Sequence, residues 1–164
     1  MNEKSLKKVS SYITGERVDS ASEMIQESLI FLNMEMKDRE EVLTFMCNAV
    51  TDEARLKINP LDQVMKREAL SATEIGFETA LPHPFDYDAK QPYLELMTLK
   101  KSVLWKKTRV RLILLIILPK QETSLSRRLN DGVAQLVSDP EYVRELLDCI
   151  SKEEALTCLN RMLR

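Results

Sequence analysis

The residues whose types could support chemistry gather in one short stretch of this sequence. His83 is the only histidine among 164 residues, and it lies between Pro82 and Pro84 after a short apolar segment. Proline has no backbone N–H to donate, so we expect a strand end or turn here, where α/β folds often place reactive groups. Two interpretations follow: the imidazole is either a packed structural ring or a nucleophile at the mouth of the fold.

A cation and several hydroxyl groups precede this histidine. The segment KREALSATEIG (66–76) contains Arg67, Ser71 and Thr73, and it ends at Gly76. Cationic and hydroxyl donors are the groups that hold the oxygens of a dianionic phosphoryl group. The combination therefore favours a functional imidazole over a structural one.

The composition excludes several other classes of protein. Apolar residues make up 44% and charged residues 30%, which predicts one soluble globular domain, and the net charge of −2 does not favour a nucleic-acid groove. The longest apolar run, LILLIIL (112–118), is too short to cross a bilayer and suits a buried strand. We expect a cytoplasmic protein, because no secretory signal is visible. Its three cysteines lack metal-binding spacing, so we expect reduced thiols, no metal and no cofactor.

The elements expected to position these residues alternate between helices and strands. Residues 1–26 are predicted to be a linker or leading helix, with a capping box at Ser20 and Glu23. An edge strand (28–34) precedes a helix over 37–56 and a second helix in which Asn59 is the cap and Pro60 the first residue. A strand over 93–99, a turn and a buried strand over 109–118 follow, then helices over 123–137, from 140 and from 151, the last with a capping box of Ser151 and Glu154. The pattern predicts a mixed α/β fold, a β-sheet sandwiched between helices.

The segment REALSATEIGFETALPH (67–83) resembles the active-site segment of enzyme IIA domains of the bacterial sugar phosphotransferase system, mannitol/fructose type. Its likeness extends more loosely over 27–164, predicted here as the enzyme IIA-like domain. The positions in register with the family pattern are Arg67, Glu68, Thr73, Ile75, Gly76, Ala80, Leu81, Pro82 and His83.

This resemblance implies the phosphotransferase enzyme IIA fold and a phosphoryl group accepted by His83 from the phosphocarrier protein HPr, without a metal. It makes Arg67 the candidate cationic contact, or the residue that orients the loop, and Thr73 the candidate hydroxyl donor. Alternatives stay open for both. Arg67 could form a surface ion pair with Glu68 or a neighbour, and the Thr73 hydroxyl could bond to nearby backbone.

The sequence also departs from the family pattern. Glu78 replaces the second glycine of the motif, and the second histidine of many transport-type members is missing from a region that holds Ser124 and Ser126.

The string LKKSVLW (99–105), which ends at Trp105, resembles enzyme IIA-like domains of sugar-operon activators and antiterminators. We therefore expect a regulatory domain acting on adjacent domains of its chain, with no direct contact to nucleic acid. The alternatives are an enzyme IIA that passes phosphate to enzyme IIB of a transporter, or a binding module that is no longer phosphorylated.

Overall fold

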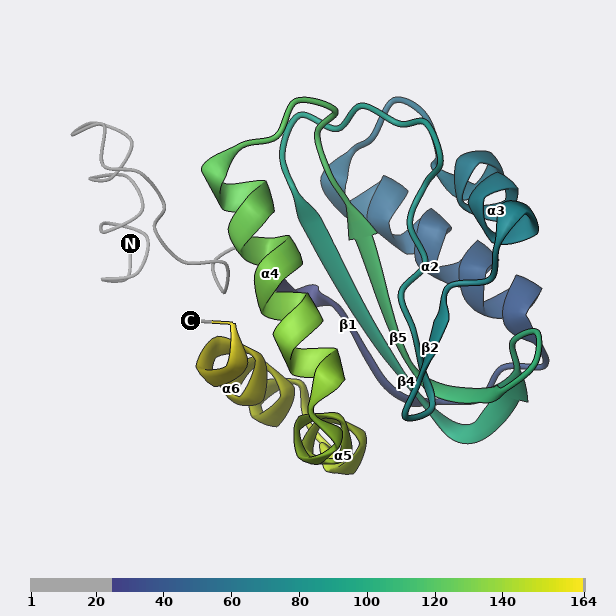
Figure 1. Ribbon diagram of the computed structural model, residues 1–164, viewed down its shortest axis with the longest axis vertical. Coiled ribbons are helices and arrows are strands. Elements are labelled where there is room, and N and C mark those ends of the chain that lie inside the picture. The colour runs from purple at the N-terminus through teal and green to yellow at the C-terminus, as the bar shows by residue number, and fades with distance from the viewer. Residues whose placement is uncertain (1–24, 164) are drawn as a thin grey trace.

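The computed structural model describes residues 25–163, which form a sheet between two layers of helices (Figure 1). Each helix starts where a polar or proline residue can begin it: Asp38 accepts from the Glu41 N–H, and Asp139 caps the helix that opens with Pro140. In chain order the elements are β1 (Ile25–Met34), α2 (Arg39–Ala54), α3 (Leu61–Leu70), β2 (Glu74–Gly76), β3 (Thr79–Ala80), β4 (Tyr93–Leu104), β5 (Arg109–Ile117), α4 (Ser124–Ser138), α5 (Pro140–Asp148) and α6 (Lys152–Met162). The predicted cap at Ser20 and Glu23, and most of the predicted leading segment, lie outside the described residues.

The sheet is mixed, with the strand order β1-β4-β5-β3-β2. The pairs β1–β4 and β3–β5 are parallel, whereas β4–β5 and β2–β3 are antiparallel. The apolar run at 112–118 forms most of β5, which is buried on both faces at the centre of the sheet. The predicted edge strand over 28–34 is confirmed as part of β1.

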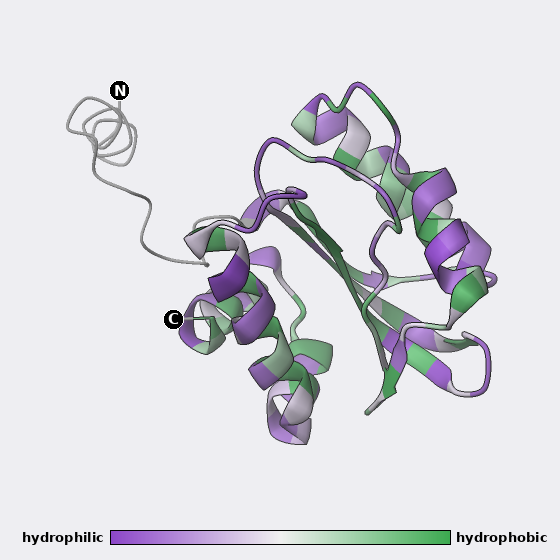
Figure 2. Ribbon diagram, turned by 45° about the horizontal axis from the view of Figure 1, so that its top comes forward, coloured by the Kyte–Doolittle hydropathy of each residue, from purple (hydrophilic) through white to green (hydrophobic). Residues whose placement is uncertain are grey.

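Helices cover both faces of the sheet, as the alternation of elements predicted. Helices α4, α5 and α6 lie on one side and α2 and α3 on the other (Figures 1 and 2). The buried side chains accordingly form two clusters, one under each layer of helices. None of the helices within 25–163 is both long enough and apolar enough to span a membrane.

The structure corrects the predicted turn before β5. β4 continues beyond residue 99 to Leu104, and after a register irregularity between Thr98 and Val103 it pairs again with β5. The turn is therefore confined to residues 105–108. Lys100 and Lys101 gave this segment a loop-like composition, but both are exposed where the strand pairing is irregular.

Smaller differences concern helix ends. Asn59 accepts a hydrogen bond from the Leu61 N–H at 2.9 Å, as a cap should, but the helix starts after Pro60 and not with it. At α6, the Ser151 hydroxyl accepts from the Glu154 N–H, and the Glu154 carboxylate accepts from Ile150. The second half of the predicted capping box therefore forms one residue earlier than expected.

Candidate functional site

His83 lies just beyond the carboxyl ends of two neighbouring parallel strands. β3 runs parallel to β5, and the Ile116 N–H donates to the Pro82 carbonyl at 3.1 Å, which extends the alignment past the end of β3. The prolines on either side of His83 end the strand pairing, as the sequence predicted. Strand ends of this kind are common places for functional groups in open α/β sheets.

Glu78, the acidic departure from the motif, lies at the other end of this segment. Phe77 and Glu78 both have positive φ values, 50° and 55°, and form the tight connection between β2 and β3. The Glu78 carbonyl accepts from the backbone N–H groups of Arg111 and Leu112, near the start of β5. His83 follows Glu78 by five residues, which in a fully extended strand is on the order of 17 Å. The backbone of Glu78 is thus held at the opposite end of β3 from the imidazole.

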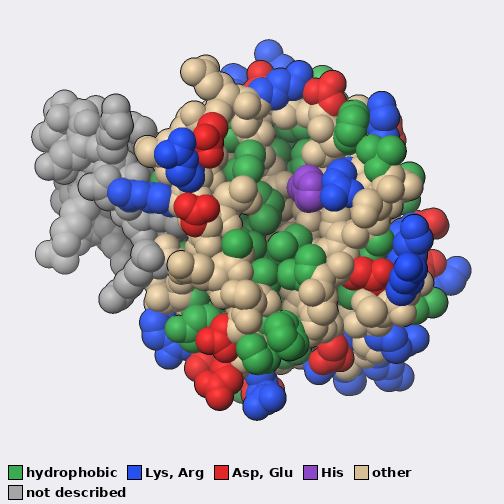
Figure 3. Space-filling view, in the orientation of Figure 1, with side chains coloured by type: hydrophobic (Ala, Val, Ile, Leu, Met, Phe, Trp, Pro, Cys, Tyr) green, Lys and Arg blue, Asp and Glu red, His purple; other side chains and the backbone are tan. Residues whose placement is uncertain are grey.

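Hydrogen bonds fix the ring of His83 in one tautomer. Nδ1 lies 2.9 Å from the Leu81 carbonyl oxygen, which can only accept, so Nδ1 carries the proton. The Arg67 Nε–H, which can only donate, lies 3.1 Å from Nε2. The lone pair is therefore on Nε2, in a half-buried ring at the surface. Figure 3 shows the single histidine (purple) open to solvent beside a basic side chain and hydrophobic groups.

Arg67 is brought to the imidazole by the last turn of α3. Its guanidinium Nη1 also donates to the Ser71 carbonyl just after the helix, so the side chain bridges the helix end and the histidine loop. No ion pair between Arg67 and Glu68 forms within residues 25–163. Arg67 therefore contacts the imidazole directly, and its role in phosphoryl transfer stays a prediction.

Thr73 differs from its expected position. It is 5% exposed, and its hydroxyl donates to the carboxylate of Glu68, which also accepts from the Thr73 N–H at 3.1 Å. Trp105 completes the arrangement, because its indole N–H donates to Glu68 at 3.1 Å. The Thr73 hydroxyl is thus turned into the protein, and its partner is a buried side chain and not the backbone. Its contact with Glu68 supports the helix end that carries Arg67.

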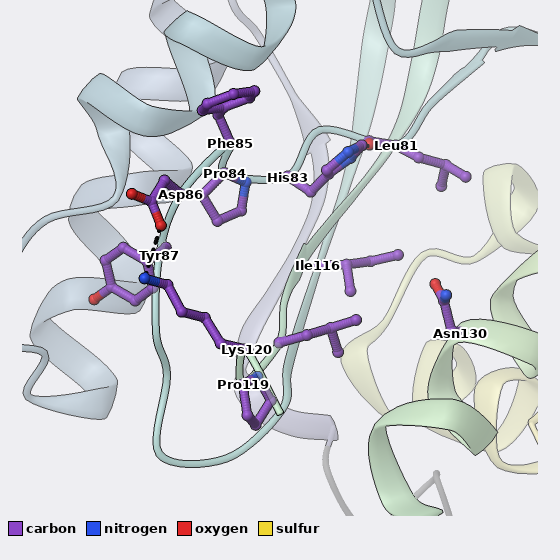
Figure 4. A pocket seen from close by; sticks show the side chains of 11 residues that line it. Leu81, His83, Pro84, Phe85, Asp86, Tyr87, Ile116, Pro119, Lys120 and Asn130 are labelled. Atoms are coloured by element: carbon purple, nitrogen blue, oxygen red, sulfur yellow. Dashed lines mark hydrogen bonds and ion pairs between the residues drawn. The ribbon is translucent and has the colours of Figure 1, made fainter. Parts of the chain in front are cut away.

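A cavity of about 500 Å³ opens beside the imidazole (Figure 4). Three segments contribute to it: the loop after β3, the end of β5 with the residues that follow, and α4. The lining residues are Leu81, His83, Pro84, Phe85, Asp86, Tyr87, Ile116, Leu118, Pro119, Lys120 and Asn130. The cavity thus combines apolar walls with a few polar groups, as ligand and partner sites commonly do.

Two further cations border this surface. Lys120 forms an ion pair with Asp86 at 2.9 Å, and the hydrogen bond to Asp86 raises the pKa of Lys120. Lys66 lies over the exposed ring of Phe85, 5.1 Å from its centre. Lys120 and Asp86 were missed in the sequence. Pro119 was predicted to end the buried strand, but only the pairing of β3 with β5 shows that the residues after it lie near His83.

The region of the absent second histidine offers a different donor. Ser126 is buried and exchanges hydrogen bonds with Thr123 in the capping box of α4, while Ser124 is exposed in the first turn, and neither lines the cavity. Asn130, one turn further along α4, does line it, and no sequence signal distinguished it from other surface residues. Within the described chain, no group of three or more His, Cys, Asp and Glu side chains is arranged to hold a metal ion.

Known proteins share both this fold and this sequence pattern. The chain is 25% identical over 147 residues to the probable licABCH operon regulator of Bacillus subtilis, which covers 90% of this chain and 23% of that protein. The chain thus spans about a quarter of the regulator's length. The crystal structure of the nitrogen regulatory protein IIA-Ntr from Neisseria meningitidis superimposes with a TM-score of 0.75 at 22% identity, covering 84% of this chain and 97% of that one.

A second solved structure is the complex of enzyme IIA-Mtl with phosphorylated enzyme IIB-Mtl from Escherichia coli. It matches with a TM-score of 0.70 at 18% identity and covers 82% of this chain and 96% of that one. The family model for the phosphoenolpyruvate-dependent sugar phosphotransferase system, EIIA 2, matches residues 23–162. The chain belongs to this EIIA 2 family of the sugar phosphotransferase system.

Proposed function

We propose that this domain accepts a phosphoryl group on Nε2 of His83 from the phosphohistidine of HPr. The observation that carries the proposal is the fixed tautomer: Nδ1–H donates to the Leu81 carbonyl, and the Nε2 lone pair faces the Arg67 Nε–H at 3.1 Å. An in-line transfer requires a nitrogen with a free electron pair beside a cation that can hold the phosphoryl oxygens. Both groups are present at the mouth of the cavity.

The transfer needs one movement in this chain. Nε2 attacks phosphorus as the bond from phosphorus to the donor nitrogen breaks, and the donor nitrogen keeps the electron pair of that bond. Since the Nε2 lone pair accepts from Arg67 in the resting protein, the guanidinium must release it and turn toward the phosphoryl oxygens. The Nδ1 proton stays in place, and its bond to the Leu81 carbonyl keeps the ring oriented.

A regulatory role fits better than a role in transport. The related sequence of the licABCH operon regulator is about four times as long as this chain, and an added phosphoryl charge could act on neighbouring domains of such a chain. The second histidine of many transport-type members is also absent.

The family match begins at residue 23 and β1 at Ile25, so we place the domain start slightly before the predicted residue 27. Since the proposed phosphoryl donor is HPr, we therefore propose that the domain acts in the cytoplasm.

The test is to incubate the chain with phosphoenolpyruvate, enzyme I and HPr and to measure its intact mass. We expect one added phosphoryl group in the wild type and none in His83→Gln. Arg67→Ala should slow the transfer by about 10- to 100-fold, because a charge-assisted contact is lost. Arg109→Ala is the matched control, since Arg109 is exposed at the far end of β5, where it bonds to Ser102. No addition to the wild type, with HPr shown to be phosphorylated, would refute the proposal.

A second experiment separates the regulatory role from the relay role. The phosphorylated chain is isolated and mixed with an enzyme IIB of the mannitol type, the kind of partner bound by the related enzyme IIA-Mtl. Retention of the phosphoryl group, with return to HPr, supports regulation. Rapid transfer to enzyme IIB supports the alternative, a component of a sugar transporter.

A further inference from the structure

Two cysteines form a close pair on elements remote from the imidazole. Cys149 is the first residue after α5, and Cys158 lies in α6. Their sulfur atoms are 3.8 Å apart, and both thiols are free. The site of His83 is built from α3, α4 and the strand ends, so nothing in the proposed phosphoryl transfer requires this pair.

The pair is open to solvent on one side. A surface hollow of about 610 Å³ is lined by Glu145, Asp148, Cys149, Ser151, Glu153, Glu154, Thr157, Cys158 and Arg161. Cys158 is half-buried and Cys149 is 4% exposed, so a small reagent reaches Cys158 first. Cys47, in contrast, lies in α2 and is completely buried.

The two thiols have different surroundings. Burial raises the pKa of Cys149 to about 12, and its thiol donates to the Glu145 carbonyl at 3.3 Å. The Cys158 thiol faces the Glu145 carboxylate, which also forms an ion pair with Arg161. Because Cys158 is the more exposed of the two thiols, it is the sulfur that reacts with an external reagent, and Cys149 is the one that resolves the product.

We infer that Cys149 and Cys158 form an intramolecular disulfide when the protein meets a hydroperoxide. The Cys158 thiolate attacks one peroxide oxygen, the O–O bond breaks, and a sulfenic acid and hydroxide result. Cys149 sulfur then attacks the Cys158 sulfur and displaces its hydroxyl, which leaves as water with the Cys149 proton. In total, two thiols and one hydrogen peroxide give one disulfide and two water molecules: sulfur is oxidised and peroxide is reduced.

The geometry allows this bond with a local adjustment. A disulfide bond is about 2.05 Å long, so the sulfur atoms must approach each other by somewhat less than 2 Å. The residues between α5 and α6 form a short connection, and Cys149 already lies outside the helical segment. We expect side-chain rotation together with a small shift of this connection to close the remaining gap.

The inference is tested on the full chain with hydrogen peroxide, followed by alkylation with iodoacetamide under denaturing conditions and peptide mapping. We expect a loss of two hydrogen atoms in mass, alkylation of Cys47 alone, and one cross-linked peptide containing Cys149 and Cys158. Dithiothreitol should restore three alkylated cysteines. Oxidation of Cys158 to sulfinic acid while Cys149 is still a free thiol would overturn the inference, as would a disulfide between two chains.

Variants sharpen the result. Cys158→Ser should remove the cross-link, and its Cys149 should react with hydrogen peroxide far more slowly than Cys158 does in the wild type. Cys47→Ser is the matched control and should form the cross-link as the wild type does. The wild-type peptide map decides the question even if a variant folds poorly. Phosphorylation of His83 is measured separately, and its failure would leave the chemistry of the thiol pair unaffected.

Discussion

Two buried glutamates on the same side of the sheet have opposite surroundings. Glu68 is 2% exposed in α3, and Glu95 is 1% exposed in β4. The carboxylate of Glu68 accepts three hydrogen bonds, from the N–H and hydroxyl of Thr73 and from the indole of Trp105. Within residues 25–163, neither oxygen of Glu95 has a hydrogen-bond partner. The carboxylate of Glu68 therefore links the segments around it, whereas the buried carboxyl group of Glu95 reduces the stability of the fold.

The positions of the two residues explain this difference. Glu68 lies where three segments meet: the end of α3, the strand that leads to the imidazole, and the end of β4. Glu95 lies in the middle of β4, between Leu94 and Leu96, whose side chains pack under α4–α6. Its own side chain points to the opposite face, toward Cys47 of α2, where the neighbouring side chains are apolar. A helix end supplies donors, whereas the centre of a sheet has already used its backbone donors in pairing.

The largest effect on stability is expected from substitution of Glu95. Burial raises its pKa from 4.5 to about 9, so the folded chain keeps the proton while the unfolded chain releases it. Stability should therefore be greatest below about pH 4.5 and should fall by about 1.4 kcal/mol per pH unit up to about pH 9, several kcal/mol in all. Glu95→Gln should flatten this slope in urea unfolding measured from pH 5 to 9.

The matched control is Glu53→Gln, which removes an acidic side chain from the exposed part of α2. Cys47 acts in a different range, because burial raises its pKa to about 12 and its contribution is lost only above about pH 9. A slope that persists in Glu95→Gln would mean that Glu95 is ionised in the folded protein, and the contrast with Glu68 would fail.

The same substitution at Glu68 should change the free energy of unfolding in the opposite direction, so that it destabilises the protein. Glu68→Gln replaces one accepting oxygen by an amide that cannot accept, so a donor of Thr73 or Trp105 is left unsatisfied. We expect a loss of about 1–3 kcal/mol in the free energy of unfolding at pH 8, where Glu95→Gln is stabilising. Phosphorylation should also slow, because the end of α3 carries Arg67. Stabilisation by Glu68→Gln would show that the three hydrogen bonds contribute little.

Most of the fold was predictable from local patterns. The spacing of apolar residues reports directly on which side chains are buried, and proline, glycine and capping residues mark where elements end. The run 112–118 marked the central strand, and the helical spacings marked α2 to α6. The error at residues 100–104 arose because two consecutive lysines are typical of a loop. Their strand is maintained by cross-strand pairing with β5, such as Val103 with Val110. This pairing cannot be recognised from the neighbouring residues in the sequence.

The site was predictable where its residues share one segment. Arg67 and His83 were expected to meet, and they do, over a separation of 16 residues. The direction of the Thr73 hydroxyl was not predictable, because it depends on Glu68 being buried, and charged residues are rarely buried. Lys120 and Asn130 come from distant segments, so only the arrangement of the strands and α4 brings them to the cavity.

Trp105→Phe tests one of the three bonds to Glu68. The change removes the indole N–H but keeps an aromatic ring in the core, so we expect a loss of about 1–2 kcal/mol, measured by urea unfolding. In the Glu68→Gln background the same change should cost less, because the shared hydrogen bond is already weakened. Equal losses in both backgrounds would assign the effect to packing alone.

The smallest effect on stability is expected at Glu74, a half-buried carboxylate at the surface that also accepts several hydrogen bonds. Desolvation alone would raise the pKa of Glu74, but hydrogen bonds from Thr108 and Lys107 outweigh it and the net shift is downward. Its stabilisation should be present above about pH 4.5 and be lost as the pH falls further, which is the reverse of Glu95. Because water screens this site, Glu74→Gln should cost less than about 1 kcal/mol at pH 7 in urea unfolding and nothing measurable at pH 3. A loss as large as that of Glu68→Gln would mean that the number of hydrogen bonds, and not burial, determines the contribution of a carboxylate in this protein.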